Sequence, residues 1–174
     1  MLAAPIAAAQ TAAGVTVQGL FETPVIEAAA LRSSQGADLR VGVRITNRTR
    51  GPLRFATFAA VLPELIDASG RTVAFAGGSN MAAPPAPGAA QLTPPGQSRT
   101  IRLSARLRLR DNELDWVDDT GLTGFWRVSQ RDAPYRMRLR YTSFGALGEA
   151  AWRGQATSQA VSLPLNLAGH DRDH

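Results

Sequence analysis

The stretch "IRLSARLRLR" (101–110) contains the clearest structural pattern in the chain. Apolar and polar residues alternate along its whole length, and four of its five polar positions are arginine. Alternation with a period of two is typical of a β-strand that has one buried face and one solvated face. The sequence therefore predicts a strand that carries a row of guanidinium groups on its outer side.

Similar short segments occur along the chain and predict further strands. They lie at 15–21, 39–46, 53–62, 124–129, 135–143 and 159–165, and a hairpin is expected at 64–75. Segment 53–62 is apolar on both sides, which predicts either a strand covered on both faces or one interrupted by a bulge. Helical turns are expected only at 25–36, ending at Gly36, and at 111–119, where acidic residues would lie near a helix N-terminus.

Many short strands with few helices predict an all-β fold, an antiparallel β-sandwich with at most one or two short helices. An immunoglobulin-like topology is our working hypothesis within that class, although the chain lacks the Cys–Trp–Cys pattern. We expect one sandwich domain at 15–165, a residual signal-like or flexible N-terminus at 1–14 and a flexible tail at 166–174. Trp116, Trp126 and Trp152 are expected to be at least partly buried.

A proline-rich segment interrupts the strand pattern at 76–98. It contains five prolines, which lack a backbone N–H, so we expect one long surface loop outside the sheets. Long loops in compact domains are often functional, and a rigid projecting loop suits insertion into a protease cleft. A disordered surface insertion is the alternative interpretation.

The composition limits the classes of protein. All 19 basic residues are arginine, the net charge is +5 and alanine, glycine and proline are abundant, which indicates a GC-rich, bacterial genome. The absence of cysteine excludes disulfides, thiolate nucleophiles and cysteine-ligated zinc. No run of 18 apolar residues occurs, so the sequence predicts no transmembrane helix.

The N-terminal residues "MLAAPIAAAQTAAG" (1–14) resemble the last part of a secretory signal. Ala7 and Ala9 match the A-x-A cleavage pattern, with Gln10 as the first mature residue. A basic n-region is missing, because the first basic residue is Arg32. We expect a periplasmic or secreted protein; an alanine-rich flexible N-terminus is the alternative.

Catalytic, metal and cofactor sites are not expected. The histidines, His170 and His174, lie in the last five residues, where no fixed geometry for a catalytic base is expected. The acidic run at 111–119 does not match an EF-hand, because Trp116 and Leu122 occupy the positions that need glycine and glutamate. Its acids are expected instead to neutralise the arginines that precede them. The sequon at Asn47 is interpreted as a coincidence.

The arginine rows are the candidate site. They are expected to point outward while apolar residues fill the core, and adjacent rows would repel unless carboxylates interleave or an anionic partner binds. Nucleic acid is not expected as the partner, because Tyr135 and Tyr141 lie on the face opposite the arginines, whereas sheets that bind single strands present aromatic rings among basic residues. The candidate anion-binding residues are Arg102, Arg106, Arg108, Arg136, Arg138 and Arg140.

Together these features predict a non-enzymatic, exported binding or assembly module of the bacterial cell envelope. Its partner is expected to be a protein or an anionic envelope component that contacts the outward arginines. A solvated outer face without a partner is the alternative interpretation of the arginine rows. A protease inhibitor acting through the loop at 76–98 is the alternative function, and the residues predict no oligomeric state.

Overall fold

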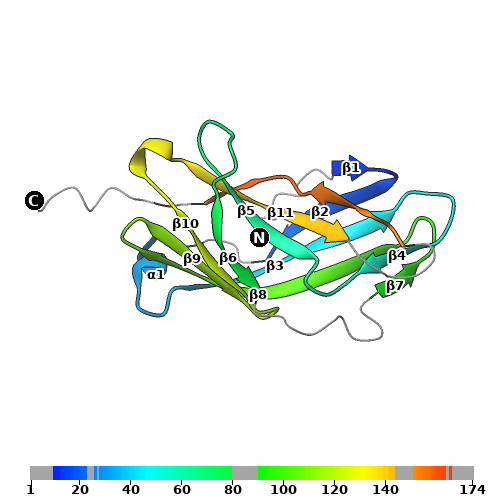
Figure 1. Cartoon of the computed structure of the whole chain (residues 1–174), viewed down its shortest axis with the longest axis horizontal. Coiled ribbons are helices and arrows are strands. Elements are labelled where there is room, and N and C mark those ends of the chain that lie inside the picture. The colour runs from blue at the N-terminus through cyan, green and yellow to red at the C-terminus, as the bar shows by residue number, and fades with distance from the viewer. Residues whose placement is uncertain are drawn as a thin grey trace, which may run out of the picture.

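The computed structural model describes residues 10–22, 26, 28–79, 90–143, 151–163 and 165. The strands are β1 (Gln10–Ala12), β2 (Val15–Phe21), β3 (Ala37–Asn47), β4 (Leu53–Ala56), β5 (Val61–Ile66), β6 (Phe75–Ser79), β7 (Ala90–Thr93), β8 (Ser98–Arg110), β9 (Glu113–Asp118), β10 (Leu122–Arg127), β11 (Tyr135–Ser143), β12 (Gly154–Thr157) and β13 (Val161–Leu163). The helical elements are α1 (Ala28–Arg32) and the 3₁₀-helix η1 (Gln130–Asp132). The predicted all-β class is confirmed (Figure 1).

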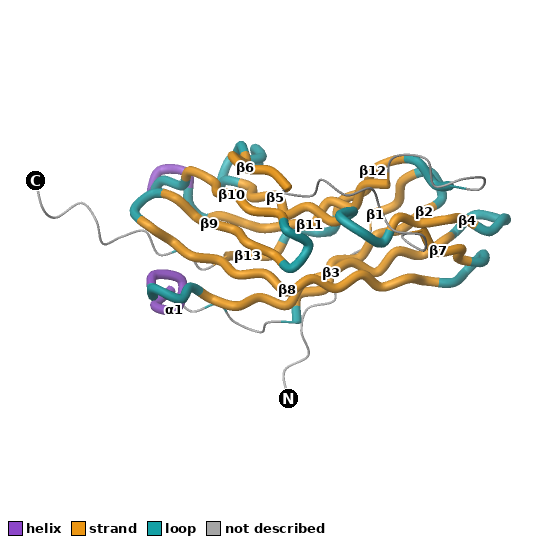
Figure 2. The backbone as a smooth tube through the Cα atoms, turned by 60° about the horizontal axis from the view of Figure 1, so that its bottom comes forward, coloured by secondary structure: helices purple, strands orange, loops and turns teal. Residues whose placement is uncertain are grey.

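Two antiparallel sheets form the body of the molecule. The larger has seven strands in the order β1-β2-β3-β8-β9-β10-β6. In the smaller, β11 pairs with β5 on one edge and with β12 and β13 on the other. Strands β4 and β7 pair separately. The sheets lie against each other in an elongated, sandwich-like arrangement (Figure 2), and the immunoglobulin-like topology stays a hypothesis.

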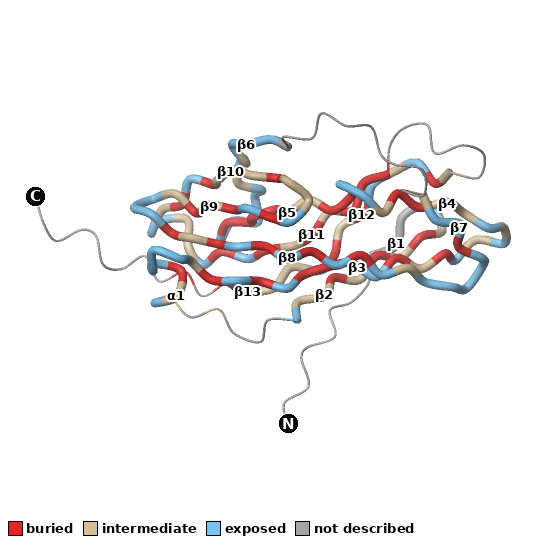
Figure 3. Tube along the Cα trace, turned by 90° about the horizontal axis from the view of Figure 1, so that it is seen from below, coloured by how far each residue is buried: buried red, intermediate tan, exposed pale blue. Residues whose placement is uncertain are grey.

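The core lies between the sheets and is built from the apolar face of each strand. Buried positions alternate with exposed ones along β8, as its pattern predicts (Figure 3). Trp116 and Trp126 are fully buried and Trp152 nearly so, which confirms the expectation for all three. Trp152 stacks on Tyr141 at 5.7 Å between ring centroids, and burial raises the pKa of the Tyr141 hydroxyl above its usual value.

The prediction of a helix at 111–119 is wrong, because these residues turn into β9 and pair with β8. Asp111 and Asn112 form the connection, and Asp111 adopts a left-handed φ of 48°, which aspartate tolerates. Leu114 and Trp116 then alternate with outward residues and are fully buried. Burial of this period-two face outweighs the weak preference of the acidic residues for a helix N-terminus.

A strand at 53–62 and a hairpin at 64–75 are expected from the sequence. The structure has instead the separate strands β4 and β5, and no complete hairpin follows β5. The apolar run breaks between β4 and β5, where Ala59 has a φ of 49°, and the two strands belong to different sheets, so the run is neither one covered strand nor one strand with a bulge. The turn at 67–70 forms, and the Val73 N–H donates to the Leu65 carbonyl at 2.8 Å. The chain then leaves β5, and Phe75 begins β6, which pairs with β10.

The loop predicted at 76–98 is shorter than expected. Residues 76–79 belong to β6, 90–93 form β7 beside β4, and β8 already begins at Ser98. Small residues at 76–79 allow β6 to approach β10 closely, since a side chain at Gly77 would collide with Gly124. Residues 80–89, which include three of the five prolines, lie outside the described residues.

The N-terminal boundary also differs from the expectation. Strand β1 lies within the segment 1–14, for which a residual signal-like or flexible N-terminus is expected, and it pairs with β2 through a turn at Gly14. The expected helical segment at 25–36 contains α1, and Gly36 has a φ of 75°. Across the described residues, no helix has the length and apolarity needed to cross a membrane.

Candidate functional site

The predicted arginines of β8 lie on the outer face of the larger sheet. Strand β8 is central there, with β3 on one side and β9 on the other. Asp38 of β3 is directly opposite Arg106 of β8 in the register, and Asp115 of β9 is directly opposite Arg108 of β8. The register therefore brings carboxylates from both neighbouring strands beside the arginine row.

Ion pairs with carboxylates neutralise Arg102, Arg106 and Arg108 in this row. The Nε atoms of Arg102 and Arg106 donate to Glu22 and Asp38, each at 2.9 Å, and Arg108 contacts Asp115 at 3.3 Å. Interleaved carboxylates offset the repulsion between like charges on adjacent positions. The Arg102 and Arg106 pairs are exposed, so each stabilises the fold by only ~0–1 kcal/mol.

Arg106 and Arg108 differ in how many of their guanidinium nitrogens form hydrogen bonds. Arg108 uses Nε and Nη2 on Asp115 and donates from Nη1 to the Ser34 carbonyl, so it ties the segment after α1 to β8. Among the described residues, Arg106 is bound only by Asp38 and only through Nε, and its side chain is 56% exposed. The terminal N–H groups of Arg106 therefore remain available to donate to a carboxylate from solvent.

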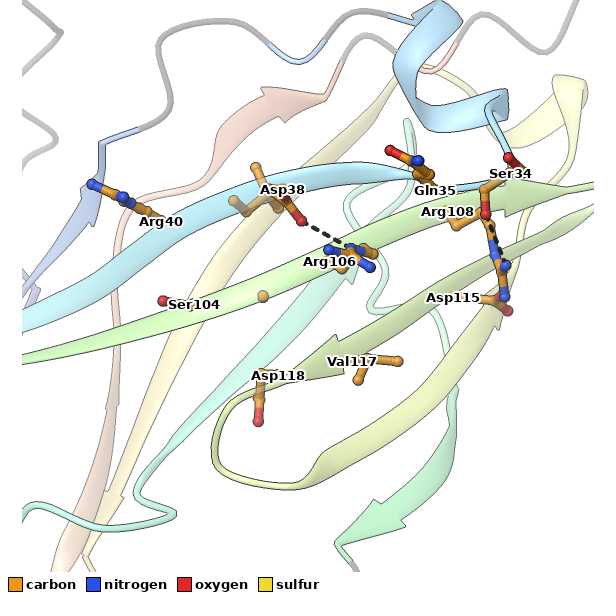
Figure 4. Close-up of a pocket in the computed structure, with 12 residues that line it drawn as sticks. Ser34, Gln35, Asp38, Arg40, Ser104, Arg106, Arg108, Asp115, Val117 and Asp118 are labelled. Carbon is orange, nitrogen blue, oxygen red and sulfur yellow. Dashed lines mark hydrogen bonds and ion pairs between the residues drawn. The ribbon is translucent and has the colours of Figure 1, made fainter.

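A groove of about 610 Å³ runs over this part of the sheet (Figure 4). Its floor includes the outward residues Arg40, Ser104 and Arg106, and Val117 adds an exposed apolar side chain from β9. The other lining residues are Ser34, Gln35, Asp38, Leu39, Ala105, Arg108, Asp115 and Asp118. The groove thus joins guanidinium donors to an apolar contact.

The other predicted arginines belong to a different surface. Arg136, Arg138 and Arg140 lie on β11, which is in the smaller sheet, so the six candidate residues do not form one site. Sequence periodicity predicts that each row points outward but contains no information on which strands are neighbours. The binding surface predicted from the sequence is therefore two separate arginine groups.

Glu64 is the residue that sequence reasoning missed. It lies on β5 directly opposite Arg138, and its side chain is only 10% exposed. Arg138 Nε donates to Oε2 at 2.7 Å, and Arg140 Nη1 approaches Oε1 at 3.1 Å. No local pattern connects Glu64 to a particular arginine, although a lone carboxylate inside the apolar run "VLPELI" (61–66) is a signal of a buried ion pair.

The carboxylates of the acidic run 111–119 form several different contacts. Asp115 contacts Arg108 and Arg110, so the predicted local neutralisation is confirmed at this residue. Asp118 instead faces the core and accepts the Trp116 indole N–H at 2.9 Å. Asp119 accepts the Ser104 backbone N–H at 3.1 Å. These carboxylates are distributed over both faces of the sheet.

The remaining sequence features are structural or lie elsewhere. Asn47 is fully buried; its amide nitrogen donates to the Gly51 and Thr93 carbonyls, and its oxygen accepts from Thr49. A buried side chain of this kind is unsuitable for glycosylation, in agreement with the interpretation of the sequon as a coincidence. His170 and His174 lie outside the described residues, as do Ala7 and Ala9. The protease-inhibitor hypothesis now depends on residues 80–89, which are also outside them.

Comparison with models of known protein families found no match, and comparison with curated proteins found none either.

Proposed function

We propose that the protein is a non-enzymatic, exported binding or assembly module of the bacterial cell envelope. In this proposal it contacts an acidic protein segment through the groove over β3, β8 and β9. The observation that carries the proposal is the position of Arg106 in that groove, held by Asp38 at one edge and exposed at the other, beside the apolar side chain of Val117.

The chemistry of the groove supports a carboxylate as the group recognised. A guanidinium binds a carboxylate with two parallel N–H donors, and the terminal nitrogens of Arg106 present this fork. Arg40 also lines the groove, and Ser104 is opposite it in the register. Val117 offers an apolar contact for a side chain next to the bound carboxylate. Acids already in the groove limit its net charge, so long-range attraction comes from the +5 charge of the whole chain.

The double substitution Arg40→Gln with Arg106→Gln tests this surface. We expect at least a roughly tenfold loss of affinity for the component that the wild-type chain retains from envelope extract, because hydrogen bonds to charged groups contribute ~1.5–3 kcal/mol each. The midpoint of thermal unfolding should change little, since Arg106 forms an exposed ion pair. Titration by calorimetry or surface plasmon resonance measures the affinity.

The matched control is Arg127→Gln with Arg153→Gln, which removes the same charge from exposed positions outside the groove lining. It should bind within about threefold of wild type at physiological salt, where exposed charges are screened beyond ~8 Å. Equal affinity of the groove variant and this control would show that the arginine row is only a solvated face.

Export is the second part of the proposal and rests on the A-x-A pattern at Ala7 and Ala9. Cleavage after Ala9 would leave all of β1, which begins at Gln10. We expect cell fractionation of the native producer to place the protein in the periplasm or medium, with Gln10 as the first residue by mass spectrometry. Recovery of the full-length chain from the cytoplasm alone would contradict export.

A further inference from the structure

Charge is distributed unevenly along the length of the molecule. The end formed by β4, β7 and the loops 47–53 and 91–98 lies opposite the end that carries α1 (Figure 1). The described segments that build it contain no aspartate or glutamate; they are 10–18, 43–60, 90–101, 141–143 and 151–157. Its arginines, which we call together the basic end, are Arg44, Arg48, Arg50, Arg54, Arg99 and Arg153.

The arginines of the basic end lack the carboxylates that neutralise the arginine rows elsewhere. None of them forms an ion pair with another described residue. Arg99 instead donates to the Leu92 carbonyl at 2.9 Å and to the Thr93 hydroxyl at 3.2 Å. Arginines gathered at one end without carboxylates create a positive potential there. The basic end therefore presents net positive charge, whereas the row on β8 is interleaved with acids.

The buried side chain of Asn47 fixes the two loops that carry this charge. Its oxygen accepts the Thr49 backbone N–H at 2.9 Å within the first loop, and its nitrogen donates to the Thr93 carbonyl at 2.9 Å in the second. Arg48 and Arg50, on either side of Thr49 in the chain, are exposed. The charges are thus held at the surface by a preorganised backbone, which lowers the entropy cost of binding.

Exposed apolar side chains accompany these charges. Phe58 is 44% exposed and Leu92 is 42% exposed, and they are two of the three large apolar side chains exposed among the described residues. Leu92 of β7 is directly opposite Arg54 of β4, so both side chains lie on the same face of this strand pair. Phe58 follows β4, two residues after its last residue, Ala56. The basic end thus combines positive charge with an apolar surface.

This combination favours an anionic bilayer over a soluble polyanion. At a membrane surface, basic side chains contact anionic headgroups while aromatic and aliphatic side chains enter the boundary between headgroups and acyl chains. A soluble polyanion would contact the arginines but would give no apolar environment to Leu92. The basic end is also formed by loops at the end of an elongated molecule (Figure 2), so a flat surface can contact it without obstruction by the sheets.

From these observations we infer that the basic end docks the protein on an anionic phospholipid surface. The arginines of the two loops contact lipid phosphate groups, and Phe58 and Leu92 enter the interfacial layer of the bilayer. This surface is separate from the groove over β3, β8 and β9, because none of its arginines lines that groove. The inference therefore does not depend on recognition of an acidic protein segment.

Cosedimentation of the full chain with lipid vesicles tests the inference. The probes are vesicles of phosphatidylcholine alone and vesicles of phosphatidylcholine mixed with phosphatidylglycerol. We expect binding to the anionic vesicles to be at least about tenfold tighter, because each arginine near an anionic surface contributes a factor of roughly five. Added salt should weaken this binding, since it screens exposed charges. Equal binding to both kinds of vesicle would overturn the inference.

Two charge variants locate the docking surface. Arg48→Gln with Arg50→Gln should weaken binding to the anionic vesicles by about tenfold or more and leave the midpoint of thermal unfolding unchanged, because both side chains are exposed. The matched control is Arg127→Gln with Arg131→Gln, which removes the same charge from exposed positions at the opposite end and should bind within about threefold of wild type. Equal losses in the two variants would mean that net charge alone attracts the protein, which would contradict docking through the basic end.

The double variant Phe58→Ser with Leu92→Ser distinguishes a bilayer from a soluble polyanion. It should weaken binding to the anionic vesicles by about tenfold or more, because it removes apolar area from the contact. Binding to heparin, a soluble polyanion, should stay within about threefold of wild type, since every arginine is retained. If this variant bound the anionic vesicles as tightly as wild type, the surface would recognise negative charge alone, and docking on a bilayer would be wrong.

Discussion

Asp118→Ala is expected to destabilise the protein by about 3–5 kcal/mol, although Asp118 is one acid in a run of five. Its buried carboxylate accepts the Trp116 indole N–H at 2.9 Å, the Thr120 N–H at 2.9 Å and the Leu122 N–H at 3.1 Å. Alanine would leave the buried indole donor and the N–H of Leu122 without an acceptor. The midpoint of thermal unfolding, followed by circular dichroism, should fall by roughly 10 °C.

Asp119→Ala is the matched control for this prediction. Asp119 is the next residue along the chain, is exposed and accepts the Ser104 N–H at 3.1 Å. Its substitution should cost no more than ~1 kcal/mol, because water can replace the lost acceptor. If the two variants unfolded at the same temperature, Asp118 would not have the structural role assigned to it.

Glu64→Gln is the second substitution with a large expected effect. It removes the only carboxylate that contacts Arg138 and Arg140 within the described structure, and it keeps the size of the side chain. Breaking a buried ion pair by removal of one partner costs ~3–5 kcal/mol, and the arginine side chains are about a third exposed, so we expect about 2–4 kcal/mol. Urea unfolding at neutral pH measures the free energy of unfolding.

Two further variants separate charge from packing. Glu22→Gln removes the partner of Arg102 in an exposed pair and should cost less than ~1 kcal/mol. Glu64→Leu combined with Arg138→Leu and Arg140→Met removes all three charges together and should recover most of the loss, since replacing buried ion pairs by apolar residues is often neutral. A triple variant less stable than Glu64→Gln would contradict the electrostatic explanation.

The strands were largely predictable because each strand of a two-layer fold must bury one face. The alternation in 101–110 and 135–143 identified β8 and β11, and the apolar positions of both strands are buried in the core. The same alternation of apolar and polar residues is present at 113–118, where Leu114 and Trp116 alternate with outward residues. The acidic composition of that segment was given more weight than its periodicity, and the helix prediction was wrong for this reason.

For the candidate sites, the direction of the arginine side chains could be predicted from the sequence, but their ion-pair partners could not. The sequence by itself determined that the arginines of β8 and β11 point away from the core, because the period of a strand decides which residues share a face. Only the tertiary structure decided their partners. The pairs Arg102–Glu22, Arg106–Asp38 and Arg138–Glu64 join residues that are 80, 68 and 74 positions apart. Strand order and register, which no local pattern encodes, bring them together.

The same distinction separates the two arginine groups. The local sequence patterns of β8 and β11 are alike. Strand pairing nevertheless places β8 between β3 and β9 and places β11 beside β5. Trp126 and Arg140 are both predictable as strand residues, one inward and one outward. Both residues line the same open pocket of about 220 Å³, together with Glu64 and Phe75. The sequence alone thus determined which side chains were available, and the packing of one sheet against the other determined which of them meet.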